Sequence, residues 1–205
     1  MAHVGSWDSI QRWGLLSTVA LLDLFGISGE DRQLIERAHR PESITIRDHD
    51  HGTAVIRDQK PMREGPLRRC LDGMSVEEWY TLLNGKVFFW VTEARLNTLL
   101  NAKPYRNRPH TVITVDTGEL MTRHLHKATL SPINSGSTIY NPHPRGPDTF
   151  RSLDQYPFEE RRRMRGLRNA VAELAVDYSV QDIREFALRI EDRQNSRVVR
   201  VIHPA

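Results

Sequence analysis

The chain of 205 residues has little of several features that would place it in a specialised class of proteins. It contains a single cysteine, Cys70, which excludes an internal disulfide and any zinc site built from several cysteines. Long apolar runs are also missing, because none approaches the ~18 residues that a membrane-spanning helix needs. Neither sign of charge dominates, since 29 basic residues against 26 acidic ones leave a net charge of only +3. These absences predict a cytoplasmic protein without a membrane segment or a secretory signal.

Several common catalytic motifs are absent as well. The sequence has no GxSxG, no GxxxxGK[ST], no GxGxxG and no HExxH. Two histidine pairs, His49/His51 and His124/His126, are spaced by two residues, so the members of each pair share a face only in an extended segment. Turn chemistry explains the DHDHG segment better than a metal site does. We therefore expect no metal.

The basic residues are unevenly distributed despite the small net charge. A segment around 158–169 is expected to form a basic helix and carries a cluster of arginines, among them Arg161, Arg162, Arg163 and Arg165. Such a cluster is either a solvated helix face or a surface that contacts phosphates. Charge patterning alone leaves both interpretations open.

The length predicts one domain spanning residues 1–205, and the order of elements indicates an α+β fold, because strands and helices mix without regular βαβ alternation. Good helix signals occur at 75–85, which has a capping box, and at 92–102, which Thr92 is expected to cap. Strands are expected at 86–91, 110–117, 170–178 and 196–202, and a hairpin at 44–59. We expect residues 128–150 to form a loop and residues 179–191 to begin a helix.

One residue of the expected strand at 170–178 needs an explanation. Glu173 is a carboxylate between apolar neighbours, and such a group is costly to bury unless it is paired. It either points outward to water or has a partner within the fold. A second polar segment, INSGST at 133–138, is best read as a connecting loop. The alternative is that its backbone N–H groups bind an anion.

Three separated segments gain significance in combination. The first contains His3, Ser9, Ile10, Gly14, Leu15, Leu16 and Ser17; the second is the strand with Phe88, Phe89 and Trp90; the third contains Glu173, Ser179, Val180 and Ile183. Their order and local patterns resemble the ADP-ribosyltransferase fold. The nearest likeness is to DarT-type enzymes, which modify DNA, and to an uncharacterised bacterial family related to them. The resemblance implies an α+β fold with split, mixed β-sheets around an NAD cleft and flanking helices.

The resemblance also implies roles for individual residues. Glu173 and His3 would be catalytic, with Glu173 stabilising the oxocarbenium ion that develops as nicotinamide leaves and His3 binding the adenosine ribose. The NAD co-substrate would further contact Ser17, Phe89 or Trp90, and the guanidinium of Arg57 would bind a phosphate.

The partners implied by the resemblance are NAD and a nucleic-acid acceptor, either DNA or RNA. Arg161, Arg162, Arg163 and Arg165 are the residues expected to contact the nucleic acid. The resemblance further suggests a toxin or phage-defence effector, with an antitoxin or regulatory protein as a partner.

Departures from the family pattern leave two alternatives open. The second segment has Phe-Phe-Trp where many relatives have a tyrosine. Val171 stands two residues before Glu173, where arginine-modifying members carry an acidic or amide residue, so protein arginine is a less favoured acceptor. The alternatives are an RNA 2′-phosphotransferase-like enzyme that consumes NAD and a non-catalytic module that binds nucleic acid.

Overall fold

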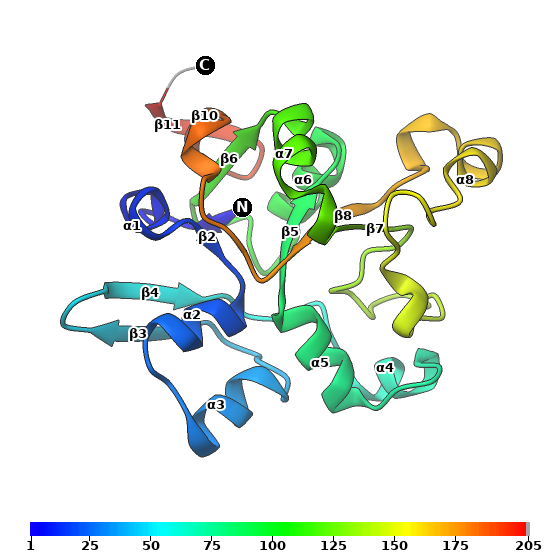
Figure 1. The fold of residues 1–205 in the computed structure, drawn as a ribbon, viewed down its shortest axis with the longest axis horizontal. Coiled ribbons are helices and arrows are strands. Elements are labelled where there is room, and N and C mark those ends of the chain that lie inside the picture. The colour runs from blue at the N-terminus through cyan, green and yellow to red at the C-terminus, as the bar shows by residue number, and fades with distance from the viewer. Residues whose placement is uncertain (204–205) are drawn as a thin grey trace.

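A computed structural model of the protein describes residues 1–203 and has an α+β architecture (Figure 1). The helices are α1 (Trp7–Trp13), α2 (Thr18–Leu24), α3 (Gly29–Glu36), α4 (Glu64–Cys70), α5 (Val76–Asn84), α6 (Glu93–Leu100), α7 (Thr117–His124) and α8 (Phe158–Arg165). The strands are β1 (Ala2–His3), β2 (Leu15–Leu16), β3 (Ile44–Asp48), β4 (Gly52–Ile56), β5 (Lys86–Trp90), β6 (His110–Val115), β7 (Ala128–Ser131), β8 (Glu173–Asp177), β9 (Ser179–Val180), β10 (Ala187–Gln194) and β11 (Arg197–His203). In the described part of the chain, no helix has the length and apolar character needed to cross a bilayer.

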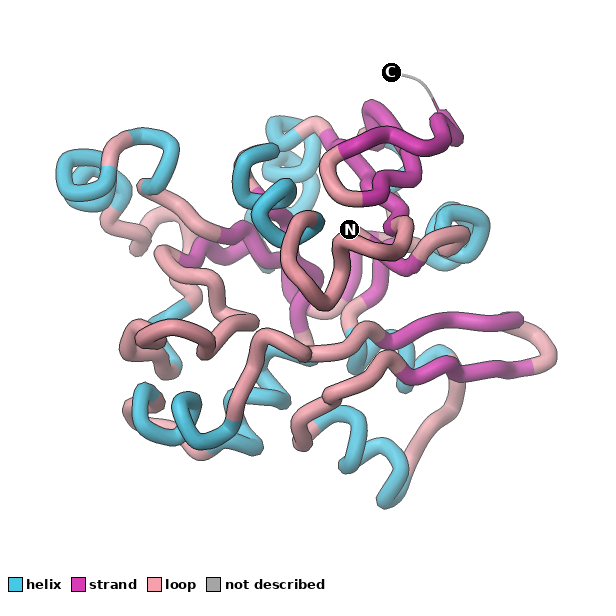
Figure 2. The backbone as a smooth tube through the Cα atoms, turned by 180° about the vertical axis from the view of Figure 1, so that it is seen from behind, coloured by secondary structure: helices cyan, strands magenta, loops and turns pink. Residues whose placement is uncertain are grey.

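Two sheets form the centre of the molecule. One has the strand order β1-β6-β10-β11 and the other the order β5-β8-β7 (Figure 1). Two smaller pairs accompany them: β2 pairs with β9, and β3 with β4 forms a hairpin that projects from the body, as the view from behind also shows (Figure 2). Strands that neighbour each other in these sheets run antiparallel, which corrects the expectation of mixed sheets. A two-residue turn joins β10 to β11, and so short a connection permits only antiparallel pairing.

The alternation along β8 decides which side chains enter the core. Leu174 and Val176 point into the main apolar cluster, which also contains Val87 of β5, Leu130 of β7 and Ile190 of β10. This cluster fills the space between the two central sheets. Because successive residues of a strand face opposite sides, Glu173 lies on the other face of β8.

That other face of the β5-β8-β7 sheet is covered by a second cluster. It is built on α5 and the segment before it, with Trp79 and Tyr80 fully buried and Phe88 and Phe150 packed against them. The predicted capping box of α5 is present: the Ser75 hydroxyl accepts from the Glu78 amide, and the Glu78 carboxylate accepts from the Ser75 amide. This helix therefore begins where local sequence dictates.

The largest error of the secondary-structure prediction concerns residues 179–191. The expected helix is absent, and the segment instead forms β9, a short 3-10 turn at Ile183–Glu185 and most of β10. Strand β10 pairs with β6 on one side and β11 on the other, so its backbone groups are satisfied across the sheet. The loop expected at 128–150 begins with strand β7, and helices α4 and α7 were not predicted.

Gly14 has a structural role that explains its place in the first of the three segments, next to Leu15 and Leu16. Its φ of +84° is strained for other residues, and a Cβ atom there would lie 2.4 Å from the Cα of Gln181. The close approach lets Leu15 and Leu16 pair with Val180 and Ser179. The pairing joins the N-terminal segment to the chain that leaves β8.

Candidate functional site

The carboxylate of Glu173 lies inside the protein and accepts two hydrogen bonds from one residue. Glu173 is the first residue of β8 and is only 4 % exposed. The amide and the hydroxyl of Ser135 both donate to its Oε2 atom, at 3.1 Å and 2.6 Å. The outward-pointing alternative for Glu173 is therefore wrong, since its partner lies within the fold.

The surroundings of Glu173 give it an unusual acidity. Burial raises its pKa from 4.5 to about 7, because the charged form loses its hydration. The two Ser135 donors oppose this rise, and the positive charges of Arg145 and Arg95 oppose it more weakly. Near neutral pH the group is therefore present both as a carboxylate and as a carboxylic acid, a state in which it can exchange protons with a substrate.

Ser135 belongs to the INSGST loop, which was expected to be a simple connection. The alternative interpretation describes it better, because a backbone N–H of the loop does bind an anion. That anion is Glu173 of the same chain. Ser135 is itself 1 % exposed, so the contact is sealed from solvent.

Arg145 fixes the loop that carries Ser135. Its guanidinium donates to the Ser135 carbonyl at 2.9 Å and lies 5.7 Å from the centre of the Trp79 ring. Its backbone is bonded on both sides to the segment that ends α4, through the Cys70 carbonyl and the Asp72 amide. The side chain is 4 % exposed, so this cation is built into the structure.

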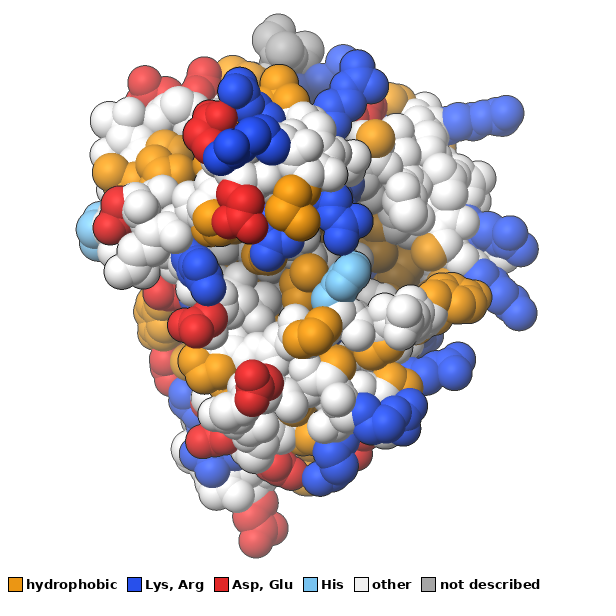
Figure 3. Space-filling model, turned by 90° about the vertical axis from the view of Figure 1, so that its right-hand side faces the viewer, with side chains coloured by type: hydrophobic (Ala, Val, Ile, Leu, Met, Phe, Trp, Pro, Cys, Tyr) orange, Lys and Arg blue, Asp and Glu red, His pale blue; other side chains and the backbone are white. Residues whose placement is uncertain are grey.

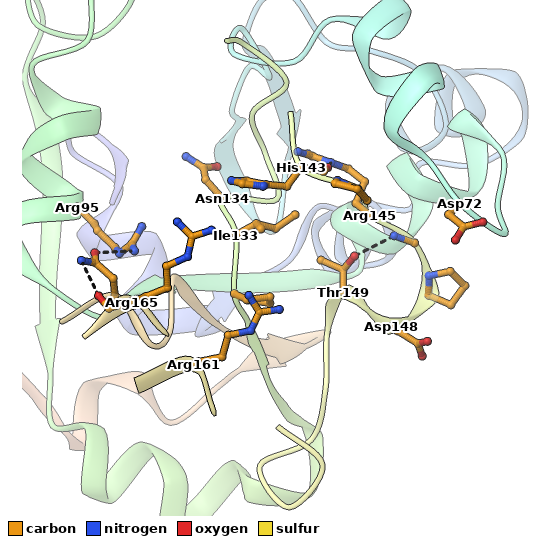
Figure 4. Close-up of a pocket in the computed structure, with 15 residues that line it drawn as sticks. Asp72, Arg95, Ile133, Asn134, His143, Arg145, Asp148, Thr149, Arg161 and Arg165 are labelled. Atoms are coloured by element: carbon orange, nitrogen blue, oxygen red, sulfur yellow. Dashed lines mark hydrogen bonds between the residues drawn. The ribbon is translucent and has the colours of Figure 1, made fainter. Parts of the chain in front are cut away.

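A cleft of about 730 Å³ lies beside this arrangement and is rich in arginines. Its charged and polar lining includes Arg95, Arg145, Arg161, Arg165, His143 and Asn134, with Asp72 and Asp148 at the end away from Arg95 (Figure 4). We refer to it as the arginine cleft. In the space-filling view this side of the molecule is hollowed, and Lys and Arg side chains lie at the rim together with hydrophobic and acidic ones (Figure 3).

The structure divides the predicted arginine cluster of α8 into two pairs. Arg161 and Arg165 line the arginine cleft. Arg162 and Arg163 are exposed and interact with Glu159 of the same helix: Arg162 forms an ion pair of 2.9 Å, and Arg163 donates to the Glu159 carbonyl at 3.4 Å. The cluster is thus partly a cleft lining and partly a solvated helix face.

The predicted aromatic residues line a second cavity, of about 490 Å³, which we call the aromatic cavity. Phe89 and Trp90 lie there with Leu174 of β8. Trp90 is the direct register partner of Glu173 across the β5–β8 pair. Phe89 packs against the main apolar cluster, because it has the opposite orientation along β5.

The three remaining predicted residues line one further cavity, of about 260 Å³, here called the His3 cavity. His3 is exposed, Ser17 is buried and caps α2 by accepting from the Ala20 amide at 3.1 Å, and Arg57 lies 5.1 Å from the ring centre of Tyr105. Burial lowers the pKa of Arg57. The His3 cavity and the aromatic cavity share four lining residues, Met1, Ala2, Leu15 and Phe88, and therefore adjoin.

The structure thus divides most of the predicted site residues among three cavities, of which the His3 cavity and the aromatic cavity adjoin. Glu173 itself is not among the lining residues of these three cavities in the described part of the chain. It lies between two of them: its strand partner Trp90 lines the aromatic cavity, and Arg145, which contacts Ser135, lines the arginine cleft. Sequence reasoning missed Arg95 and Arg145, which carry no local motif.

Comparisons with known proteins give one match. A family model described as a family of unknown function (DUF7002) matches residues 1–187. Neither the search of curated proteins nor that of solved structures gave a match.

Proposed function

The chain belongs to the DUF7002 family, whose function is unknown, and we propose from its own geometry that it is an NAD-dependent ADP-ribosyltransferase. The observation that carries the proposal is the position of Glu173. It is a buried carboxylate that titrates near neutral pH, held by Ser135, between an aromatic cavity and an arginine cleft. A buried carboxylate without a charged partner destabilises the fold. Such a group, with a pKa shifted toward neutrality, is typical of a catalytic site.

The chemistry uses the charged form of Glu173. The bond between the ribose C1′ and the nicotinamide nitrogen breaks, its electron pair leaves with nicotinamide, and an oxocarbenium ion develops on the ribose. A fixed carboxylate close to that ion stabilises the transition state. The acceptor then forms a bond to C1′ and releases its proton, which Glu173 or solvent takes up.

The side chains that line the two adjoining cavities match the chemical groups of NAD. The aromatic cavity offers Trp90 and Phe89 as flat surfaces for the nicotinamide ring. In the His3 cavity, the imidazole of His3 and the Ser17 hydroxyl supply hydrogen-bonding groups for ribose, and Arg57 supplies a cation for phosphate. Together the two cavities fall within the size range of small-molecule sites.

The arginine cleft supports a nucleic acid, DNA or RNA, as the acceptor. Four guanidinium groups along one cleft suit a phosphodiester backbone, which carries a regular series of negative charges. The cleft is linked to Glu173 through Arg145 and Ser135, and the aromatic cavity through Trp90, so that an acceptor and NAD would occupy separate cavities. A toxin or phage-defence role with a neutralising protein partner belongs to the same proposal and is supported by the resemblance alone.

The test is incubation of the protein with NAD labelled in its adenosine part, together with separate pools of DNA, RNA and protein. We expect label to enter a nucleic-acid pool with release of nicotinamide, and we expect Glu173→Gln to abolish both. Intact NAD with every pool would overturn the proposal and would favour a non-catalytic nucleic-acid-binding module.

The arginine cleft also supports one alternative function. An RNA 2′-phosphotransferase that consumes NAD relies on basic residues and needs no catalytic carboxylate, so the cleft alone would suit it. Glu173 separates the two functions. Full turnover by Glu173→Gln on a 2′-phosphorylated RNA would establish the phosphotransferase instead.

A further inference from the structure

Ser135 and Arg145 form a continuous chain of contacts from the arginine cleft to Glu173. We propose that Ser135 is a positioning residue that orients the Glu173 carboxylate and favours its ionised form, and that Arg145 holds Ser135 in place from the cleft. This inference rests on the proposed function, in which Glu173 acts as a carboxylate. It adds to the site two residues that lie outside the three segments on which the family resemblance rests.

The hydrogen bonds are arranged so that one carboxylate oxygen is fixed. Both Ser135 donors reach Oε2, and among the described residues Oε1 accepts no hydrogen bond. Fixing one oxygen restricts rotation of the carboxylate and thereby fixes where the other oxygen lies. Such restriction matters because a small misplacement of a catalytic group is costly in rate.

The same two hydrogen bonds from Ser135 also influence the ionisation of Glu173. The groups that face Glu173 are the neutral Ser135 from the loop and, further away, the guanidinium groups of Arg145 from the loop and Arg95 from α6. A hydroxyl or amide that donates to a carboxylate favours its ionised form. Ser135 therefore offsets part of the effect of burial, which by itself would keep Glu173 protonated.

Arg145 gives Ser135 its fixed place. Beyond the bond to the Ser135 carbonyl, its own position is constrained by Gly146, where a Cβ atom would lie 2.2 Å from the Asp72 carbonyl oxygen. The loop is thus tightly packed against the segment after α4. Because Arg145 also lines the arginine cleft, an anion bound there would contact the residue that holds Ser135.

The experiment measures the titration of Glu173 directly, by ¹³C NMR of its carboxyl carbon, with Glu173→Gln to assign the signal. We expect Ser135→Ala to raise the midpoint by about one pH unit, the size expected for one lost hydrogen bond to a charged group. Ser135→Thr, which keeps the hydroxyl, should titrate like the wild type. Ser137→Ala removes a hydroxyl from the same loop without touching Glu173 and should also leave the midpoint unchanged.

The pH profile of nicotinamide release provides the functional readout. Ser135→Ala should move the ascending limb to higher pH by the same amount, with roughly a five-fold loss at pH 7 that is recovered in alkaline buffer. KM for NAD should not change. Arg145→Lys should move the limb in the same direction by less, since an ammonium keeps the charge but not the fork geometry.

The outcomes separate the inference from the proposed function. An unchanged titration midpoint and pH profile in Ser135→Ala would overturn the inference. If Ser135→Ala does not fold, Ser135→Cys takes its place, because a thiol fills the same space and is a weaker donor. A shifted midpoint without nicotinamide release even from the wild type would reject the proposed function while leaving the Ser135–Glu173 contact established.

Discussion

Two buried carboxylates, Glu173 in β8 and Glu191 in β10, are treated by the fold in opposite ways. Glu191 is fully buried, and it forms ion pairs with two arginines of its own strand, Arg189 at 2.7 Å and Arg193. Glu173 is almost as deeply buried, yet both of its hydrogen bonds come from the neutral Ser135. The positive charges near Glu173, on Arg145 and Arg95, act from a greater distance.

This difference separates a structural carboxylate from a candidate catalytic one. An ion pair inside a protein neutralises its partners, so that neither charge is available for chemistry. A carboxylate held by neutral donors keeps its charge unmatched, and burial raises its pKa to about 7. The fold tolerates this unfavourable state at Glu173 and avoids it at Glu191.

The largest expected effect is on catalysis. Glu173→Gln should lower nicotinamide release on the order of a thousandfold, because it removes the charge that stabilises the transition state. Glu191→Gln should change the turnover of the folded protein by only a few-fold. Release rates of the two purified variants at pH 8, normalised to folded protein, measure the contrast. Equal losses in both would remove the distinction between the two residues.

The next effect is on stability and concerns Glu191. Glu191→Gln removes one of the two carboxylates that pair with Arg193, since Glu93 remains at 2.8 Å, and should lower the free energy of unfolding by roughly 2 kcal/mol. Urea denaturation at pH 7 measures this change. Glu191→Asp serves as the control, because it retains the charge on a shorter side chain. A stability equal to the wild type would show that the ion pairs are dispensable.

The stability effect of Glu173 should have the opposite sign and depend on pH. Its pKa in the folded protein, about 7, lies above its usual value of 4.5. Between these values the unfolded chain releases a proton that the folded protein retains, so stability falls as the pH rises and the full cost is present above pH 7.

Glu173→Gln removes this cost. It should therefore be more stable than the wild type at pH 8, by at most roughly 3 kcal/mol, and should lose most of that advantage by pH 5. Thermal denaturation at the two pH values tests the prediction. The idea fails if the two proteins have the same pH dependence of Tm.

The smallest effect should come from the two arginines of α8 that line the arginine cleft. Replacing Arg161 and Arg165 together with glutamine should weaken binding of a single-stranded oligonucleotide and lower the slope of log K against log salt by about 2. The matched control is the double replacement of Arg162 and Arg163, which lie on the same helix outside the cleft. Equal changes in both double variants would indicate attraction to α8 as a whole rather than binding in the cleft.

Local sequence signals predicted the elements whose stability is local. The capping box at Ser75 and Glu78, the Thr92 cap of α6 and the hairpin at 44–59 are confirmed, because their hydrogen bonds join residues close in the chain. The helix expected at 179–191 is wrong for the opposite reason. Its segment pairs with β6, more than 70 residues earlier in the sequence, and no local pattern reports such a partner.

The residues of the candidate site likewise differ in whether the sequence could reveal them. Glu173 stood out in the sequence because a lone carboxylate in an apolar strand needs a partner, and this reasoning requires no coordinates. The identity of that partner could not be found, since Ser135 lies 38 residues away in a loop without a specific motif. Arg95 and Arg145 were invisible for the same reason: an isolated arginine carries no signal until the fold places it beside a cleft.

The sequence by itself determined the α+β class, the caps and turns, and the choice of Glu173 as the residue to explain. These features depend on side-chain chemistry and on spacing over a few residues. Only the tertiary structure decided that Glu173 is buried, that Ser135 holds it, and that Glu191 is neutralised where Glu173 is not. The pKa of a carboxylate depends on the solvent and charges around it, and in this protein those surroundings are assembled from distant segments of the chain.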